Sequence, residues 1–290
     1  MKTSYLINLA LLVLIIVLYW LNTNQHQQPE AQISTIDSSK ITQISISQAN
    51  NIKAIIEKQG TAWQLTHPIS ARANPTRIDL LLSILSSASD KSMDIASPDK
   101  LKQFGITDAS LHMTFNQQYE FIFGTTEKMS RQRYVFFHNR LYLVPDRIVP
   151  LLNASSYSFI DNRVLPPGQS ITKLVIPSYR VDQTLSAPTI SIENKRGHWQ
   201  SDHNYSSDQL QKLVEQWQYA YATQVLPLAK IDQNQFSLPV KIWVNKQEYP
   251  YEFQLILTPQ ALYVLDQQQQ LAYQFAADSY SQLLFKSDIN

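Results

Sequence analysis

The apolar positions form one continuous run near the N-terminus, and segments with a strand or helix period follow it. Residues 5–21 are apolar except for Asn8. At about 1.5 Å per residue, a helix over this run would be about 25 Å long, close to the thickness of a membrane hydrocarbon core. Tyr5, Tyr19 and Trp20 lie at its ends, where aromatic rings favour the headgroup boundary. This pattern predicts a membrane-spanning helix.

A cleaved signal peptide and a buried soluble helix are the two other interpretations of this run. Cleavage requires small residues in an A-x-A arrangement, which residues 21–25 do not supply. Lys2 precedes the run and the next Lys or Arg is Lys40, so the positive-inside rule places the N-terminus in the cytoplasm. We therefore expect an uncleaved anchor at residues 1–22 in the bacterial inner membrane, with the bulk of the chain in the periplasm.

A polar tether and then a repeated strand pattern follow the anchor. Residues 23–40 are rich in Asn, Gln, Ser and Thr and have no apolar period, which predicts a flexible linker. Residues 41–46 alternate apolar and polar positions, as a half-buried strand does, and residues 171–176 repeat this alternation. A hairpin pattern with one large aromatic residue comes next in both places, with Trp63 in the first and Trp199 in the second.

A helix pattern follows each hairpin pattern at a constant offset of 132 residues. Asn74 before Pro75 predicts the first N-terminus, and Ser206 with Gln209 predicts the second as a capping box. The apolar faces consist of Ile78, Leu81, Leu82 and Leu85 in the first helix and Leu210, Leu213, Val214 and Trp217 in the second. The constant offset favours a duplication over two unrelated α+β segments.

Further strand patterns complete each half. They cover residues 111–115, 119–123, 134–137 and 141–144, and then 240–244, 251–257, 261–265 and 271–275. We predict an α+β fold in which an N-terminal transmembrane helix precedes two tandem repeats, each a mainly antiparallel sheet with one covering helix. The breaker cluster Pro166-Pro167-Gly168 sets the boundary, so that the repeats cover residues 41–165 and 166–290.

The first repeat resembles a bacterial family of domains of unknown function, DUF4340, through an ordered series of short motifs. Residues 63–68 have a W-x-L-x-x-P arrangement, and a Pro-initiated, Leu-rich helix pattern follows. Residues 101–106 are similar to an L-x-x-(Tyr/Phe)-Gly-Leu segment of that family. Residues 121–124 resemble its strand ending in Gly, and residues 133–135 its Tyr-Val strand. The similarity covers about residues 40–165, and the second half resembles a degenerate copy.

This resemblance implies an N-terminally anchored envelope protein without assigned chemistry. Similar members are often encoded beside gliding-type ABC-transporter components, which implies an accessory role near such a transporter. The family has no agreed catalytic residues that could be carried over. In the second half Ser237 stands where Gly105 does, and Gly124 has no counterpart, which puts any site at those turns in doubt there.

Composition narrows the classes of function. The chain has 290 residues, of which 44% are hydrophobic and 16% charged, unlike a disordered tail or a multi-span membrane protein. A net charge of +1 argues against a nucleic-acid partner. With no Cys and only five Gly, the sequence has no thiol chemistry, P-loop or dinucleotide fingerprint. We expect no cofactor, no metal site and no nucleic-acid partner.

Candidate chemistry is limited to a few polar groups. His198, Asp202 and His203 have oxygen and nitrogen atoms that could bind a metal, although their spacing is more typical of surface polarity. Glu193 with Asp202, or Asp161 with Arg163, could form acid–base pairs, although surface ion pairs are the more usual explanation. No catalytic residue is predicted.

One basic cluster occurs in the first half only. It consists of Lys128, Arg131, Arg133, Arg140 and Arg147, around one predicted hairpin. Arg131 and Arg133 are two residues apart, so on a strand they would share a face. A feature of one copy is not needed by the fold, so these residues are candidates for an interface with an acidic partner or anionic headgroups. The alternative is a solvated face that keeps an edge strand soluble.

These features predict a non-enzymatic binding or scaffold protein of the envelope, with a protein partner such as an ABC-transporter complex. A second interpretation is a small-molecule, lipid or glycan binder that uses the groove between the two repeats, since domain junctions often form such sites. A hydrolase with dispersed carboxylates is the third.

Overall fold

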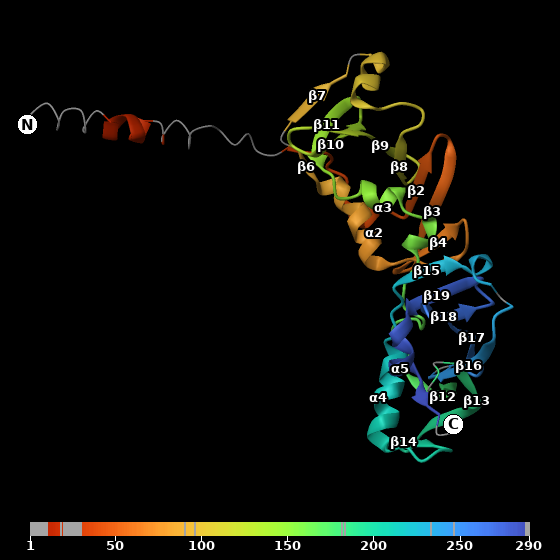
Figure 1. Ribbon diagram of the computed structural model, residues 1–290. Coiled ribbons are helices and arrows are strands. Elements are labelled where there is room, and N and C mark those ends of the chain that lie inside the picture. Colours follow the sequence, from red (N-terminus) through yellow and green to blue (C-terminus); the bar gives the residue numbers. More distant parts are fainter. Residues whose placement is uncertain are drawn as a thin grey trace, which may run out of the picture.

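A computed structural model describes residues 11–17, 19, 31–89, 91–95, 97–180, 182, 184–232, 234–245 and 247–287 (Figure 1). Of the predicted anchor, residues 5–21, only 11–17 and 19 are described, and these are helical and exposed. The remainder of that prediction lies outside the described residues. In the part of the chain that the structure describes, no helix has the length and apolar character needed to cross a membrane.

The described end of the predicted linker lies against the folded part of the chain. Within residues 31–40 are a short strand, β1 (Ala31–Gln32), and a 3₁₀ turn, η1 (Ser38–Lys40). β1 pairs with β6 (Ala88–Ser89), and the Ser34 hydroxyl donates a hydrogen bond to the Leu85 carbonyl at 2.8 Å. Ile33 is only 2% exposed. The packed part of the molecule therefore begins within the segment that composition alone predicts to be a tether.

The first large sheet has nine strands in antiparallel pairs. In spatial order they are β5 (Ala71–Arg72), β4 (Ala62–His67), β3 (Asn51–Gln59), β2 (Gln43–Gln48), β8 (Leu111–Phe115), β9 (Tyr119–Thr126), β10 (Gln132–Phe137), β11 (Arg140–Pro145) and β7 (Lys91–Asp94). The helical elements of this half are α2 (Pro75–Leu82), η2 (Ser83–Ser86), η3 (Pro98–Phe104), α3 (Val149–Asn153) and η4 (Ser156–Phe159).

The second large sheet also has nine strands. Its order is β14 (His198–Ser201), β13 (Leu185–Lys195), β12 (Ile171–Tyr179), β16 (Ser237–Val244), β17 (Tyr251–Leu257), β18 (Ala261–Asp266), β19 (Leu271–Ala276) and β15 (Gln224–Pro227), and β20 (Phe285–Lys286) joins β12 in parallel. The helical elements are α4 (Ser207–Gln218), η5 (Leu228–Lys230), η6 (Ala277–Ser279) and α5 (Tyr280–Leu283). The predicted α+β class with mainly antiparallel sheets is confirmed.

The two sheets share one strand order. Reading from β4 to β7 and from β14 to β15, eight strands follow each other in the same sequence-to-space arrangement. In both, the last strand comes from the segment after the covering helix and lies at the far end of the sheet. Figure 1 shows the two sheets one after the other, with α2 and α4 on the same side.

The covering helices begin where the sequence predicts. The Asn74 side chain accepts a hydrogen bond from the Arg77 amide, and Ser206 with Gln209 forms the full capping box. All four apolar positions predicted for α4 are buried. In the first half, α2 ends at Leu82 and continues as η2, which contains the buried Leu85. Burial of these apolar faces against the sheets fixes the helices in place.

A short connector joins the sheets by pairing on both sides. Ile160 forms a β-bridge with Ala73 of the first half, and Arg163 forms one with Tyr221 of the second. The Val164 amide donates a hydrogen bond to the Ala220 carbonyl at 3.1 Å. Backbone pairing thus continues from one half to the other, and residues of both halves belong to one apolar core.

Candidate binding site

Strand β11 is buried on both of its faces, which identifies a second packed layer outside the main core. Tyr142 and Val144 belong to the core that α2 covers, whereas Leu141 and Leu143 alternate with them and point to the opposite, outer face. Both outer leucines are nevertheless buried. The element that covers this face is η3, whose Phe104 ring lies 4.9 Å from the Tyr134 ring of β10.

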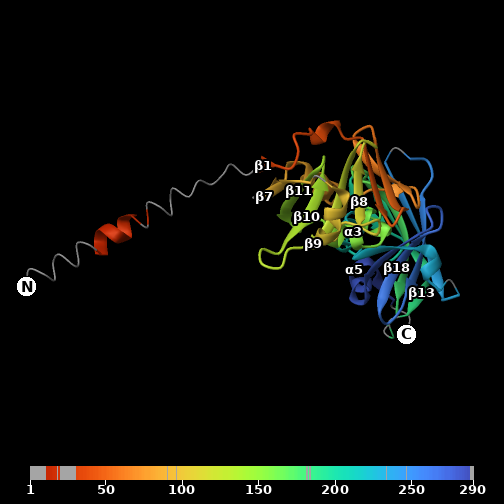
Figure 2. The same cartoon turned by 90° about the horizontal axis from the view of Figure 1, so that it is seen from above.

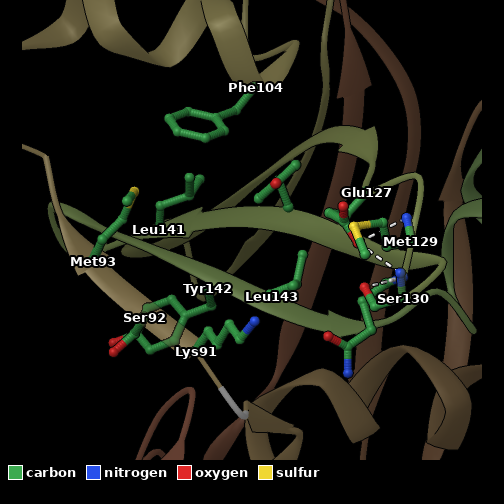
Figure 3. Close-up of a pocket in the computed structure, with 12 residues that line it drawn as sticks. Lys91, Ser92, Met93, Phe104, Glu127, Met129, Ser130, Leu141, Tyr142 and Leu143 are labelled. Carbon is green, nitrogen blue, oxygen red and sulfur yellow. Dashed lines mark hydrogen bonds between the residues drawn. The ribbon is translucent and has the colours of Figure 1, made fainter.

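A cavity of about 420 Å³ remains between η3, the end of the sheet and the β9–β10 loop (Figure 3). It is lined by Lys91, Ser92, Met93, Phe104, Glu127, Met129, Ser130, Gln132, Tyr134, Leu141, Tyr142 and Leu143. In Figure 3, Phe104 lies over Leu141, with Met93 and Met129 on opposite sides. Met93 is 49% exposed and Met129 is 93% exposed. Flexible, polarisable Met side chains at an apolar opening are typical of adaptable binding surfaces.

Two glycines allow η3 to lie against the sheet. A Cβ on Gly124 would come within 2.3 Å of the Phe104 carbonyl oxygen, so only glycine permits this approach. Gly105 ends η3 with a φ of 73°, in the left-handed region that glycine adopts without strain. The Thr125 hydroxyl donates a hydrogen bond to the Phe104 carbonyl at 3.0 Å. These contacts hold the Phe104 ring at the rim of the cavity.

The loop between β9 and β10 is held by one carboxylate. Glu127 accepts hydrogen bonds from the amides of Ser130, at 2.6 Å, and Met129, at 3.1 Å. The Ser130 backbone and side chain, then the Met129 amide, lower the pKa of Glu127 below its usual value, and the nearby Lys91 ammonium contributes in the same direction. The cavity therefore has an ionised carboxylate and a lysine at its rim.

The corresponding face of the second half is filled. Val135 pairs with Tyr142 in the first sheet as Val264 pairs with Tyr273 in the second, which aligns the two strand pairs. The next pairs outward also correspond, because Leu141 lies opposite Met93 and Ala272 lies opposite Leu226. In the second half a separate apolar cluster occupies this face, made of Leu228, Ile256, Leu265 and Ala272 with Leu226, Ile231 and Tyr263 around them.

The difference between the halves has two local causes. Phe123 pairs with Leu111 in the first half, and Leu255 pairs with Leu238 in the second, so Phe123 and Leu255 are equivalent. The residue after each lies on the outer face, and it is Gly124 in the first half and Ile256 in the second. Leu228 is equivalent to Ile95, because the Leu228 amide donates to the Gln270 carbonyl in the same way that the Ile95 amide donates to the Asn139 carbonyl. Leu228 begins η5 and is 1% exposed. The second half thus fills with side chains the space that the first half leaves open.

The structure separates the five residues of the predicted basic cluster. The Arg133 guanidinium is tied to Asp146 at 2.6 Å and to the Gly124 carbonyl at 2.6 Å, and Arg140 pairs with Asp94 at 3.0 Å. Lys128, Arg131 and Arg147 are exposed. None of these three belongs to an ion pair formed by the described residues. Arg133 therefore ties β10 to Asp146 after β11, Arg140 forms an exposed ion pair between β11 and β7, and the other three are exposed without an ion pair among the described residues.

The prediction that Arg131 and Arg133 share a strand face is wrong. β10 begins at Gln132, and Arg131 lies in the preceding turn with a φ of 57°. The register of β9 and β10 also shifts between Arg133 and Val135. Lys128 and Arg131 instead flank Met129 and Ser130, at the tip of the loop that borders the cavity.

Of the other polar candidates, Asp202, His203 and Glu193 have local partners, and His198 is exposed at the start of β14. His203 Nδ1 lies 2.9 Å from Asp202 Oδ1, and this carboxylate also accepts from the Ser191 amide at 3.0 Å. Glu193 pairs with Lys195 at 3.5 Å. Among the described residues, no group of three or more possible metal ligands is found.

Asp161 and Arg163 belong to the connector. Asp161 is 3% exposed, and its carboxylate lies 2.9 Å from the Arg163 guanidinium and 3.6 Å from that of Arg72. Hydrogen bonding to Asp161 raises the pKa of Arg163. Burial raises the pKa of the neighbouring Tyr273 to about 12, although the Arg72 charge opposes this. These residues form a buried structural network at the junction, which the sequence does not reveal for Arg72 and Tyr273.

The amino-acid sequence alone does not indicate the cavity. Its lining comes from β7, η3, the β9–β10 loop, β10 and β11, which are brought together by the pairing of β7 with β11 and by the contact of Phe104 with Tyr134. The sequence marks only Gly105 and Gly124, as motif residues that the second half lacks. The absence of these two glycines from the second half is the one signal that could have indicated a site specific to the first half.

The expected alignment of Ser237 with Gly105 is wrong. Leu238 corresponds to Leu111, which places Ser237 at the position of Ser110. Gly124, for which no counterpart is expected, has one in Ile256.

Comparison with known proteins supports the resemblance. A family model described as a domain of unknown function, DUF4340, matches residues 63–238. The match begins in β4, crosses the connector and ends in β16, so it extends into the second sheet beyond the expected limit near residue 165. No curated protein and no solved structure gives a significant match.

Proposed function

Since the chain belongs to the DUF4340 family of domains of unknown function, we propose its function from the site itself. It is a binding protein of the bacterial envelope, not an enzyme, and the cavity of the first half is its binding site. The observation that carries this proposal is the difference between the two outer faces. A cavity kept open in one half, where the other half fills the same face with Leu228 and Ile256, is not required by the fold.

The two halves are proposed to be tandem repeats of one ancestral unit. The shared order of eight strands and the constant offset of the two helices support this. After duplication, one copy can keep a binding surface while the other serves stability. In this proposal the second half is a structural support, joined to the first through the connector that contains the buried Asp161.

The location proposed is the inner membrane, with residues 5–21 as an anchor and the two sheets in the periplasm. The support is the apolar run itself, and the Lys2 that precedes it without a Lys or Arg before Lys40. The proposed partner is another envelope protein, and an ABC-transporter complex is the class that the family resemblance implies. The exposed Lys128 and Arg131 beside the cavity favour a partner with acidic residues.

A small-molecule ligand is the second candidate, and the cavity volume favours it. Small-molecule sites commonly have volumes of about 300–1,000 Å³ with apolar walls and a few polar groups. The cavity of about 420 Å³ falls within that range. It lies at the β7 end of the first sheet, whereas the connector to the second half pairs beside the opposite end, after β5.

The experiment is purification of the full-length protein from mildly solubilised membranes, as the wild type, Met93→Trp and Ile52→Trp. In Met93→Trp, the introduced indole would occupy part of the cavity from a half-exposed strand position that accommodates an aromatic residue. Ile52 is 52% exposed on β3 and does not line the cavity, so it is the matched control. We expect the wild type and Ile52→Trp to recover the same partner, and Met93→Trp to recover less than about a tenth as much. Equal recovery by all three, or no partner with the wild type, would contradict the proposal.

A further inference from the structure

The free edge of β7 lies beside the cavity. β7 is the last strand in the order of the first sheet and pairs with β11 on one side. All four of its residues are exposed, and no strand among the described residues pairs with its other side. Figure 2 shows β7, β11 and β10 together at the margin of the molecule. An exposed edge presents unpaired amide and carbonyl groups that can take a further strand.

We propose that β7 receives an extended segment of a protein partner, which adds to the sheet as a further strand and places apolar side chains in the cavity. This inference rests on the proposed function and specifies how the partner binds. Main-chain hydrogen bonds give affinity in such strand addition, and pockets for alternate side chains give specificity.

The register of β7 puts the cavity where such side chains would point. Met93 pairs with Leu141 and Lys91 with Leu143, so Met93 and Lys91 share the outer face with the two leucines. A strand added beside β7 would lie about 4.8 Å away and direct every second side chain to this same face. Since Lys91, Ser92 and Met93 all line the cavity, it reaches the edge where the new strand would start.

In both halves the segment just before the edge strand pairs with another segment of the chain. The segment that leads into β15, the counterpart of β7, pairs with the connector through Ala222 and Asn162, whose amide and carbonyl are 2.9 Å apart. The Asn162 side chain also donates to the Ala222 carbonyl at 2.8 Å. In the first half β6, which leads into β7, pairs with β1 in the same way. In both halves this pairing stops before the edge strand, and β7 itself has no partner on its outer side among the described residues.

Charge and composition identify the occupant. Lys91 and Glu127 line the cavity, and the exposed Lys128 and Arg131 flank its lining residues Met129 and Ser130 in the β9–β10 loop, so positive charge is in excess there. Residues 22–30 of this chain precede β1, but they contain no large apolar side chain to enter the cavity. The occupant is therefore a segment of another protein, with apolar residues at alternate positions and acidic residues beside them.

The first test is selection of binding peptides against the full-length protein in detergent, with a phage-displayed library of random peptides as the probe. We expect enrichment of peptides with alternating apolar residues and an excess of Asp and Glu. Their affinity should fall at least tenfold with Met93→Glu, which places a charge at the cavity, and stay unchanged with Ile52→Glu on β3. No enrichment, or enriched peptides that bind Met93→Glu equally well, would overturn the inference.

The second test examines the main-chain pairing. Two methylated forms of the best peptide are made. In one form the backbone nitrogens of the odd-numbered residues are methylated, and in the other form those of the even-numbered residues; each set is one frame. If the peptide adds to β7, the frame whose N–H groups face β7 loses at least tenfold in affinity and the other frame does not. Equal loss in both frames, together with sensitivity to Met93→Glu, would reject strand addition while leaving the cavity as the binding site. Insensitivity to both changes would reject the site as well.

Self-association gives a further outcome. If the full-length protein forms dimers that Met93→Glu abolishes, the occupant of the β7 edge is a second copy of the chain, and the inference of a separate partner is overturned. We expect sedimentation of the wild type and of Met93→Glu to give the same mass.

Discussion

The outer faces of the two sheets are formed by equivalent strands, but one face has an open cavity and the other is filled with apolar side chains. In the first half, η3 lies against the sheet at Gly124, and beside it remains a cavity of about 420 Å³ that Met93 and Met129 border. In the second half, η5 follows β15 directly, and Leu228 fills the corresponding space. The inner faces differ much less, because both are covered by one capped helix and packed with apolar side chains.

This difference shows which parts of the unit are constrained by folding. The inner face must be packed in both halves, because the covering helix is stable only when its apolar face is buried. The outer face has at least two stable solutions: a helical turn seated on Gly124, or a cluster built on Ile256. A surface that the fold leaves free to vary is where we place function.

The largest expected effect comes from emptying the filled face. Leu228→Ala removes a fully buried side chain and should lower the free energy of unfolding of the second half by about 3 kcal/mol. Ile95→Ala, at the equivalent but half-buried position, should cost less than about 1 kcal/mol. Urea unfolding of the two variants measures both values. Equal costs would show that the two faces are packed alike.

Gly124→Ala should have the next largest effect. The new Cβ would clash with the Phe104 carbonyl and push η3 away from the sheet, at a cost of about 2 kcal/mol. Lys128→Ala, in the neighbouring loop and outside every ion pair of the described residues, should change stability by less than about 0.5 kcal/mol. Thermal unfolding of the two variants and the wild type measures these changes in stability. A Gly124→Ala variant as stable as the wild type would contradict the seating of η3 described above.

Removing the N-cap side chains of the two covering helices should have smaller effects on the free energy of unfolding, and the two effects should differ. Ser206 is exposed, so Ser206→Ala should cost about 1 kcal/mol. Asn74 is buried, and its amide also lies within 3.4 Å of the Asn162 oxygen and 3.3 Å of the Tyr221 hydroxyl. Asn74→Ala should therefore cost about 1 kcal/mol more than Ser206→Ala. Chemical unfolding gives both numbers, and equal costs would show that Asn74 acts only as a cap.

The smallest effect concerns Asp266, which ends β18 of the second half. Burial raises the pKa of this carboxyl above its usual value. The folded protein then binds the proton more tightly than the unfolded chain, so this group adds stability as the pH falls through its folded pKa. Asp266→Asn should be slightly more stable than the wild type at pH 7, and the difference should disappear below about pH 3.8, the ordinary value. A difference that grows on acidification would reverse the sign and refute this.

Much of the inner architecture is predictable from the sequence, since it follows from periodicity. The strands β17 and β18 and the two capped helices lie where alternation and capping residues predict them. The edge strands β7 and β15 are not predicted. Residues of β7 are all exposed, so no alternation marks them, and the strand exists because β11 offers it a pairing edge.

The candidate site is predictable only in part, because it depends on register. The sequence indicates a basic cluster that only the first half has. It does not indicate that Arg133 pairs with Asp146, because these two residues come close only through the pairing of β10 with β11. The turn at Arg131 and the shift in register after Arg133 break the simple alternation. Long-range pairing of this kind leaves no periodic trace in the local sequence.

The most direct measurement of the central claim uses the four methionines of the chain as probes. In protein labelled with ¹³C at the Met methyl groups, Met93 and Met129 report on the cavity, and Met113, fully buried on β8, reports on the core. The probe is benzyl alcohol, a small aromatic ligand, titrated against the full-length protein. We predict saturable shifts of the Met93 and Met129 signals with Met113 unchanged, and loss of this response in Met93→Trp. Shifts that grow linearly without saturation, or that affect Met113 equally, would contradict an open site on the first half.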